Sequence, residues 1–290
     1  MEPVSTRAAV QILRVLPRER ITRLVGRFTE AHVPPKLLKP VLSVYGRAYR
    51  VAWDEAVVPE AGFTSFNDFF TRKLRDGVHR IDPDPAAVVS PADGRLEDEG
   101  PIDAGRTFTI KGQAYDAATL LGSADDAARY AGGRYFIVYL SPRDYHRVHS
   151  PVEGRVAFAR HLPGTLYPVN QFGVTHVPQL FARNERVVVQ VDSAFGPVAV
   201  VLVGAFVVGK ISLAFDGPPR PPHGGTPTER RYAPESAPYL ARGGELGAFL
   251  LGSTVVVLLP PGAPTTWQPA QASVARAVRM GEAILRQSPA

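Results

Sequence analysis

Short runs of β-branched and aromatic residues, separated by glycine and proline turns, dominate the chain from about residue 88 onward. Such runs cover residues 134–140, 186–191, 198–208 and 254–259. Short strands bounded by turn residues are typical of antiparallel sheets. This part of the chain is therefore expected to form a mainly β core, barrel-like or sandwich-like.

One pattern occurs twice in this β-rich part. Residues 90–96 read Ser-Pro-Ala-Asp-Gly-Arg-Leu, and residues 150–156 read Ser-Pro-Val-Glu-Gly-Arg-Val. In both, a Ser-Pro-x-acid-Gly turn leads into a strand. A repeated turn and strand predicts two related hairpin units within one sheet.

The first 80 residues show helical spacing instead. Ile21, Leu24, Val25 and Phe28 fall at positions i, i+3, i+4 and i+7, which is one face of a helix. Further helical patterns follow over residues 37–51 and 64–74. In the second of these, Ser65 and Asp68 have the spacing of a capping pair, and Phe66, Phe69, Phe70 and Leu74 share a face.

The Asp-Pro-Asp-Pro sequence at residues 82–85 is expected to end this helical region. The sequence thus predicts an α+β protein. A helical region would cover residues 1–80, and a β-rich domain would cover residues 81–290.

Positive charge is concentrated at the N-terminus. Residues 1–53 contain ten Arg or Lys and three acidic residues, a net charge of +7, whereas the whole chain carries +6. Basic residues opposite an apolar stripe allow a helix to lie on an anionic membrane surface. A helix packed on its own domain, with a solvated basic face, explains the same pattern. No nucleic-acid reading motif accompanies the arginines, so a nucleic-acid partner is not expected.

Several features limit the location and chemistry of the chain. It has no cysteine, which excludes disulfides, a thiolate nucleophile and cysteine-bound zinc. The longest apolar stretch, residues 198–209, is shorter than the roughly 20 residues that span a bilayer. The start of the chain does not have the pattern of a signal peptide. Residues 217–238 are expected to form a Pro/Gly-rich loop, and residues 270–290 a polar, weakly helical tail.

Three segments carry groups suited to catalysis. His146 and His149 lie three residues apart, Asp93 lies in the Pro-Ala-Asp-Gly turn, and Ser253 follows Gly252 just before an apolar run. A serine hydroxyl is a poor nucleophile unless a base takes its proton and an acid orients that base. Asp93, His149 and Ser253 could fill these roles if the fold brings them together. Each residue alone is also ordinary for a turn or a strand end.

Together these segments resemble bacterial phosphatidylserine decarboxylases, which are pyruvoyl-dependent, self-processing and membrane-associated. The resemblance covers most of residues 63–260, and its motifs occur in the family's order. They are Phe-Asn-Asp-Phe-Phe-Thr-Arg at 66–72, Pro-Ala-Asp-Gly at 91–94, Tyr-His-Arg-Val-His-Ser-Pro at 145–151, Leu-Phe-Ala-Arg-Asn-Glu-Arg at 180–186, and Gly-Glu-Leu-Gly-Ala-Phe at 244–249 followed by Leu-Gly-Ser-Thr at 251–254.

The resemblance implies a zymogen that cuts its own backbone. Activated by Asp93 and His149, the Ser253 oxygen would attack the carbonyl of Gly252 and convert the peptide bond into an ester. Elimination and hydrolysis would then leave a pyruvoyl group at residue 253. The products would be a large chain, residues 1–252, and a small chain, residues 253–290, which stay associated.

The resemblance also implies what the processed enzyme does. Its pyruvoyl group would form a Schiff base with phosphatidylserine, release carbon dioxide and give phosphatidylethanolamine. This makes the chain a carboxy-lyase of phospholipid biosynthesis that needs no metal. His146 would handle substrate or transfer a proton. The expected location is peripheral, on the cytoplasmic face of the cell membrane, and a homodimer of processed protomers is expected.

Two other functions fit parts of the sequence. His146 and His149 could be zinc ligands of a hydrolase, although zinc needs at least one more ligand. The β part could be a non-catalytic carrier-like module that binds membranes through the basic helices. A carrier needs a modifiable lysine in a tight turn, for which Lys111 and Lys210, each beside a glycine, are the candidates.

Overall fold

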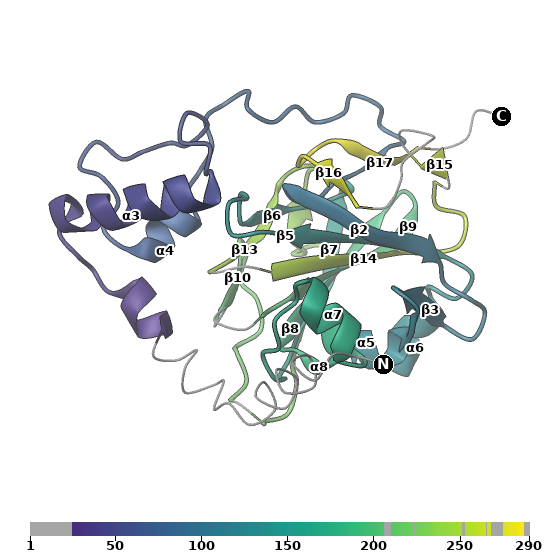
Figure 1. Cartoon of the computed structure of the whole chain (residues 1–290). Helices are drawn as coiled ribbons and strands as arrows, with labels where there is room; N and C mark the ends of the chain where they lie inside the picture. The colour runs from purple at the N-terminus through teal and green to yellow at the C-terminus, as the bar shows by residue number, and fades with distance from the viewer. Residues whose placement is uncertain are drawn as a thin grey trace.

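The computed structural model describes residues 25–205, 210–222, 224–250, 253–264, 266–267 and 275–286. Most of the predicted helix around Ile21, and Gly252 of the expected cleavage bond, lie outside these ranges. Residues 25–30 are helical. The fold is α+β, with a large antiparallel sheet and a smaller helical part beside it (Figure 1).

Strand β14 (Ser253–Leu259) lies in the middle of the large sheet. It pairs antiparallel with β5 (Arg134–Leu140) on one side and with β9 (Gly196–Val203) on the other. Every residue of β14 is buried. A continuous apolar run flanked by turns is the pattern of such a central strand, because both of its faces pack against other layers.

The sheet has nine strands and is open. Its order is β11-β7-β8-β9-β14-β5-β2-β16, with β12 pairing with β7 beside this path. In the described part of the chain the sheet does not close on itself, so the core is not the barrel that the sequence allowed as one alternative. Besides the three central strands, its members are β2 (Gly94–Pro101), β7 (Gly154–Leu162), β8 (Arg186–Ser193), β11 (Thr228–Arg231), β12 (Tyr239–Leu240) and β16 (Arg276–Val278).

Two small three-stranded sheets pack on one face of the large sheet, with orders β1-β17-β15 and β10-β13-β6. Val148, Leu246, Phe249 and Ile284 from these sheets share a buried cluster with Val255 and other residues of the large sheet. The small-sheet strands are β1 (Val88–Val89), β6 (Arg147–His149), β10 (Ile211–Leu213), β13 (Glu245–Phe249), β15 (Thr266–Trp267) and β17 (Ala283–Arg286).

The other face of the large sheet is covered by a hairpin and short helices (Figure 1). Phe108, Tyr115, Leu120 and Phe181 pack there against Val256 and its neighbours. The elements are β3 (Thr107–Ile110), β4 (Gln113–Asp116), α5 (Ala117–Leu121), α6 (Ala124–Ala128), α7 (Gln171–His176) and α8 (Leu180–Arg183).

The two Ser-Pro-x-acid-Gly turns lie against each other. The Val89 amide donates to the Pro151 carbonyl at 3.0 Å, and the His149 amide donates to the Pro91 carbonyl at 2.7 Å. Each serine hydroxyl also bonds the carbonyl two residues later, at 2.8 Å for Ser90 and 2.6 Å for Ser150. The turn that carries Asp93 is thereby fixed beside the strand that carries His149. The idea that the two turns belong to repeated units stays a prediction.

The helical part consists of α3 (Pro35–Tyr49) and α4 (Phe66–Phe70). Leu38 and Leu42 of α3 pack with Phe69 of α4 in a separate small core. Ser65 caps α4 by accepting a hydrogen bond from the Asp68 amide at 3.0 Å, as its spacing predicts. However, α4 ends at Phe70, so the longer predicted helix to residue 74 is wrong.

Leu74 instead forms a β-bridge with Ala56, because the chain after α4 turns back along the loop that follows α3. This turn brings Thr71 and Arg72 toward the β part: the Arg147 side chain donates to the Thr71 carbonyl at 2.9 Å. Tyr45 of α3 makes a similar connection by donating to the Pro142 carbonyl at 3.0 Å. The helical part is therefore docked next to the loop between β5 and β6.

Two predictions about the C-terminal part are wrong. The expected loop over residues 217–238 contains strand β11, and the expected helical tail contains β16 and β17. In both cases tertiary pairing overrides a weak local pattern: β11 pairs with β7, β16 with β2, and β17 with β1. Unpaired strand edges offer hydrogen-bonding groups that such short segments can satisfy.

Candidate active site

Asp93 lies in the turn between β1 and β2, and its carboxylate is already engaged. Oδ1 accepts a hydrogen bond from Nε2 of His79 at 2.6 Å and another from the Met280 amide at 2.8 Å. The turn itself is held by the bond between Pro91 and His149. The carboxylate is thus fixed from three sides of the fold: the segment before β1, the loop before β17, and β6.

His149 is the last residue of β6 and is buried. Its Nδ1 lies 2.8 Å from the Gly243 carbonyl, which can only accept, so Nδ1 carries the proton. Its Nε2 lies 3.1 Å from the hydroxyl of Tyr145 and is the free base of this tautomer. Burial lowers the pKa of His149, which keeps the ring neutral at physiological pH. The side chain is therefore prepared to accept a proton at Nε2.

Two side chains connect Asp93 to His149. His79, which bonds the carboxylate, lies beside the ring of Tyr145 at a centroid distance of 5.5 Å, and Tyr145 lies 5.6 Å from the ring of His149. The predicted acid and base are brought into one cluster, but no hydrogen bond joins them directly among the described residues. Sequence reasoning missed His79, an isolated histidine outside the recognised motifs, because only the fold brings it to Asp93.

Ser253 begins β14, opposite Leu140 of β5. It is fully buried, and its hydroxyl has no hydrogen-bond partner in the described part of the chain. Because side chains alternate along a strand, Ser253 shares a face with Val255, which packs with Val148 and Phe249. The hydroxyl therefore points to the side of the sheet that carries β6, although no contact joins Ser253 to His149 or Asp93 in the described structure.

His146 lies just before β6 and is completely buried. Its Nδ1 donates to the Asp144 carbonyl at 2.8 Å, so Nε2 bears the lone pair, and this atom has no partner among the described residues. The Phe70 ring lies 3.9 Å from the imidazole, and the His146 carbonyl accepts from the Phe249 amide at 3.0 Å. Burial lowers the pKa of His146 to about 3. The site therefore contains a second neutral imidazole with an available nitrogen.

The buried imidazoles should make the protein sensitive to acid. In the unfolded chain the pKa of a histidine is near 6.5. Below that pH, His146 therefore binds a proton in the unfolded chain but not in the folded protein. The resulting loss of stability is about 1.4 kcal/mol per pH unit and continues down toward the folded pKa near 3. We expect His146→Gln to reduce the slope of unfolding free energy against pH between 6.5 and 5, measured by urea unfolding. An unchanged slope would contradict a neutral, buried His146.

Comparison with known proteins identifies the family. The sequence model of the family described as phosphatidylserine decarboxylase matches residues 66–286, which include α4 and all the strands described above. The chain belongs to the phosphatidylserine decarboxylase family. The match contains Asp93, His146, His149 and Ser253.

Individual relatives match between 79% and 97% of the chain. The chain is 42% identical over 283 residues to the phosphatidylserine decarboxylase proenzyme of Acidovorax ebreus (strain TPSY), covering 97% of this chain and 98% of the relative. It is 40% identical over 272 residues to the proenzyme of Marinobacter nauticus, covering 93% and 94%. It is 44% identical over 229 residues to that of Stenotrophomonas maltophilia, covering 79% and 81%.

The described residues fit the pyruvoyl group that the proenzyme name implies. The group forms from a serine, and Ser253 presents a buried hydroxyl that no described residue contacts by a hydrogen bond, at the start of a strand beside the sheet that carries His149. By contrast, the described ranges contain no group of three or more His, Asp or Glu side chains placed to hold a metal. The lysines of the carrier alternative are paired with acids, Lys111 with Glu97 at 2.5 Å and Lys210 with Glu30 at 3.2 Å.

Proposed function

We propose that this chain is a self-processing phosphatidylserine decarboxylase. Cutting between Gly252 and Ser253 converts residue 253 into a pyruvoyl group, and the processed enzyme releases carbon dioxide from phosphatidylserine to give phosphatidylethanolamine. The observation that carries this proposal is the buried hydroxyl of Ser253, which has no partner among the described residues, in a chain that belongs to the family. Buried hydroxyls normally have a partner. Those of Thr254, Tyr115 and Tyr130 also lack one among the described residues, but they lie on the other face of the large sheet, away from β6.

The proposed self-cleavage uses Asp93, His149 and Ser253. His149 is the base, since its Nε2 carries a lone pair and burial keeps the ring neutral. The Tyr145 hydroxyl occupies that nitrogen in this geometry, so it must turn aside or pass the proton on. Asp93 acts on this base through His79 and Tyr145 rather than by direct contact. The acid and the base of the triad are therefore bridged by two further side chains.

Decarboxylation uses different atoms. The pyruvoyl ketone supplies a place for the electron pair that the departing carboxylate leaves behind. The substrate amine arrives protonated, and the Nε2 of His146, which has no partner among the described residues, can relay a proton from it and later deliver one to the decarboxylated carbon. This requires that the negative charges of the bound substrate raise the low pKa that burial gives His146. The Phe70 ring keeps water from this side of the imidazole. His146 is thus the proposed proton carrier of the second reaction.

Two measurements on the purified protein test the function. Intact-mass analysis should find two chains, residues 1–252 and a fragment starting at residue 253 with a pyruvoyl end. The same preparation should release labelled carbon dioxide from phosphatidylserine in detergent. A full-length chain with an ordinary Ser253 and no carbon dioxide release would contradict the proposal.

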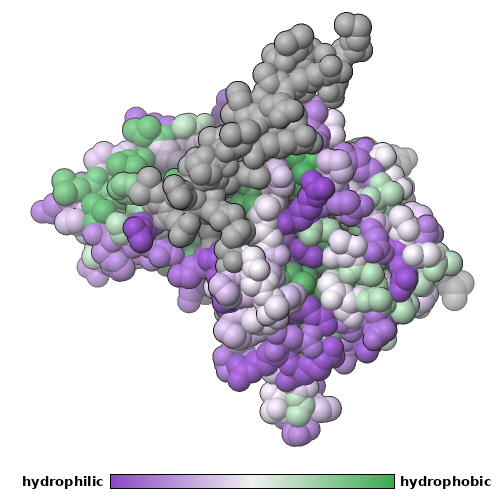
Figure 2. All heavy atoms as spheres, turned by 90° about the horizontal axis from the view of Figure 1, so that it is seen from below, coloured by the Kyte–Doolittle hydropathy of each residue, from purple (hydrophilic) through white to green (hydrophobic). Residues whose placement is uncertain are grey.

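Contact with a membrane is the second part of the proposal. Leu37, Val41 and Val44 lie at i, i+4 and i+7 on α3 and are 67%, 56% and 68% exposed, whereas Leu38 and Leu42 pack inward. Figure 2 shows hydrophobic residues gathered at the end of the molecule that contains α3. An exposed apolar face of this kind indicates an interaction surface. No helix in the described ranges is long and apolar enough to cross a bilayer.

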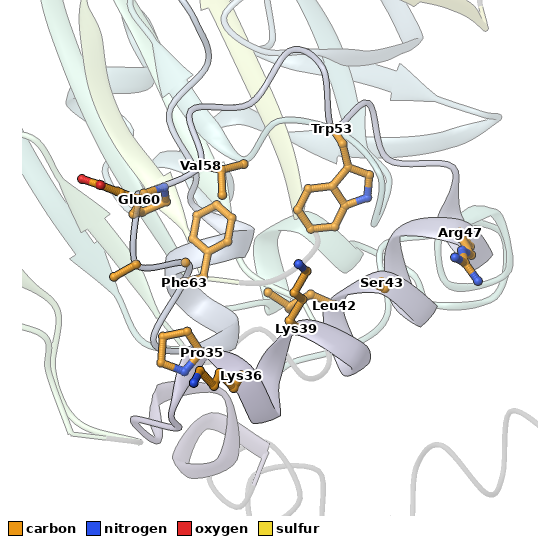
Figure 3. A pocket seen from close by; sticks show the side chains of 13 residues that line it. Pro35, Lys36, Lys39, Leu42, Ser43, Arg47, Trp53, Val58, Glu60 and Phe63 are labelled. Atoms are coloured by element: carbon orange, nitrogen blue, oxygen red, sulfur yellow. The ribbon is translucent and has the colours of Figure 1, made fainter.

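A basic face adjoins this apolar stripe. Lys36, Lys39 and Arg47 line a cavity of about 620 Å³ between α3 and the loop that follows it, with Trp53 and Phe63 on the opposite wall. In Figure 3, Lys39 reaches from α3 into the space between these two aromatic rings. Cations beside an apolar stripe suit the level of anionic headgroups. This arrangement supports docking on an anionic membrane.

We expect the triple change Leu37→Ser, Val41→Ser and Val44→Ser to weaken vesicle binding at least about tenfold, because partial burial of three apolar side chains is lost. Flotation with phosphatidylglycerol-containing vesicles measures it. Tyr239→Ser is the control, since Tyr239 is 56% exposed on β12 in the β part. Self-cleavage and activity in detergent should be unchanged. Equal binding of the triple variant and wild type would contradict docking through α3.

Three finer points stay predictions. They are the division into a membrane-association region, residues 1–80, and a catalytic domain, residues 81–290; the cytoplasmic face of the membrane as the location; and the homodimer of processed protomers. The contact between Tyr45 and Pro142 supports treating the helical part as docked on the catalytic part in the folded enzyme.

A further inference from the structure

Arg72, the residue after the cap of α4, is a buried cation that forms no ion pair with any described residue. Its side chain is only 4% exposed and lies over the Phe69 ring at 5.3 Å. Nη2 donates to the carbonyls of Arg143 at 3.1 Å and Asp144 at 3.5 Å, but Nε and Nη1 are buried with no partner in the described residues. Leaving charged donors unpaired inside a protein is costly.

The acidic side chains whose charge acts on Arg72 are all engaged elsewhere. Asp93 accepts from His79 at 2.6 Å, and Glu55 pairs with Arg279 at 2.5 Å. Asp144 accepts from the amide and the hydroxyl of Ser141, each at 2.7 Å. The two free donors of Arg72 are therefore not supplied with an acceptor by the described protein.

Arg72 also lines an open cavity of about 250 Å³ beside the proposed catalytic cluster, together with Asp93 and Tyr145. Four arginines and three carboxylates contribute to its walls, so the balance is positive. The other three arginines are Arg50, Arg143 and Arg279, and the carboxylates are Glu55, Asp93 and Asp144. An anion entering this cavity would lie beside the Arg72 guanidinium, whose Nε and Nη1 lack an acceptor among the described residues. Because both atoms are buried, the side chain must turn toward the cavity before it can make a two-point contact with an oxyanion.

The position of Arg72 relative to His146 fits one part of the substrate. Arg72 Nη2 and His146 Nδ1 lie within 3.5 Å and 2.8 Å of the same oxygen, the Asp144 carbonyl, so the two side chains are immediate neighbours. In phosphatidylserine, one methylene separates the phosphate ester oxygen from the carbon that bears the amine and the carboxylate. A group that holds the phosphate beside His146 therefore places that carbon near the free Nε2.

The chemistry decides between the two anions of the headgroup. The carboxylate loses its charge as carbon dioxide forms, so a cation bound to it would stabilise the starting state more than the transition state. The phosphodiester keeps its charge throughout, and binding it costs nothing in the barrier. We propose that Arg72 binds the phosphodiester of the phosphatidylserine headgroup and orients the amine-bearing carbon toward His146. This inference rests on the proposed function.

The test compares two substrates in detergent: phosphatidylserine and an O-alkyl serine ether, which keeps the amine and the carboxylate but lacks the phosphate. We expect Arg72→Gln to lower kcat/KM for phosphatidylserine about 30-fold or more, mostly through KM, and to change it for the ether by less than about threefold. Arg72→Lys should recover part of the loss, because it restores the charge but not the two-point contact. Lys73→Gln, the exposed cation next along the chain, should affect neither substrate.

The outcomes separate this proposal from the proposed function. Wild type that is uncut or releases no carbon dioxide overturns the function itself. If cut Arg72→Gln loses kcat/KM equally for both substrates, Arg72 only supports the fold. If it loses kcat/KM for neither substrate, Arg72 does not contact the phosphate. Either result overturns the inference. If the variants do not fold, inhibition of the wild-type enzyme by inorganic phosphate tests the inference instead. Phosphate should compete with phosphatidylserine and not with the ether, and equal effects on both would refute the inference.

Discussion

Ser253→Ala should leave the purified protein as one uncut chain of 290 residues. The proposed cleavage begins with the Ser253 oxygen attacking the preceding carbonyl, and alanine offers no atom that can do so. Because the same residue is the proposed source of the pyruvoyl group, carbon dioxide release should also fall to background. Denaturing electrophoresis and intact-mass analysis measure the first effect, and release from labelled phosphatidylserine measures the second.

Thr254 provides a matched control for this variant. Its hydroxyl is also buried without a partner in the described structure, but it lies on the opposite face of β14, where Val256 packs against the helices. Thr254→Val removes a hydroxyl at nearly constant volume and should be cut like wild type. Full cutting of Ser253→Ala, or loss of cutting in Thr254→Val with Ser253 intact, would place the reacting oxygen elsewhere.

The two neighbouring hydroxyls also show why the fold matters for this reaction. Both are buried, but only Ser253 faces the layer that contains β6 and its histidine. A register shift of one residue would exchange the two, since side chains alternate along a strand. Pairing of β14 with strands on both sides fixes the register and so determines which hydroxyl faces that layer.

The strands were largely predictable because their signal is local. Arg134–Leu140 and Ser253–Leu259 form where β-branched and aromatic runs predict them, since a central strand must be apolar on both faces. The segments at residues 228–231, 276–278 and 283–286 are short and weakly patterned, and they become strands only by pairing with an existing edge. The end of α4 was missed for a similar reason: the bridge between Leu74 and Ala56 stops the helix.

The site was predictable only in part. Motifs along the chain point to Asp93, His146, His149 and Ser253, because each residue type is one that self-cleavage or proton transfer needs. His79 and Arg72 could not be assigned in this way. Their proposed roles depend on contacts that form only in the folded chain. His79 contacts the Asp93 carboxylate, and Arg72 contacts the carbonyls beside His146.

His146→Ala should separate the two reactions. Because the proposed cleavage relies on His149, this variant should be cut and carry the pyruvoyl group. Carbon dioxide release from phosphatidylserine should fall by roughly 100-fold or more, since a positioned proton carrier contributes about 10²- to 10⁴-fold. The reason lies in the free Nε2 of His146, which the Asp144 carbonyl orients by holding Nδ1 and which Phe70 shields.

Rescue by a small base gives the sharper test of this role. Alanine at position 146 leaves a space beside Phe70 that is the shape of an imidazole, so added imidazole should restore part of the activity of the cut variant. His176→Ala serves as the control, because His176 stacks on Phe172 of α7, on the other face of the large sheet, and should not affect either reaction. An uncut His146→Ala protein would assign His146 to self-cleavage. A cut variant with nearly full activity would mean that another group carries the proton.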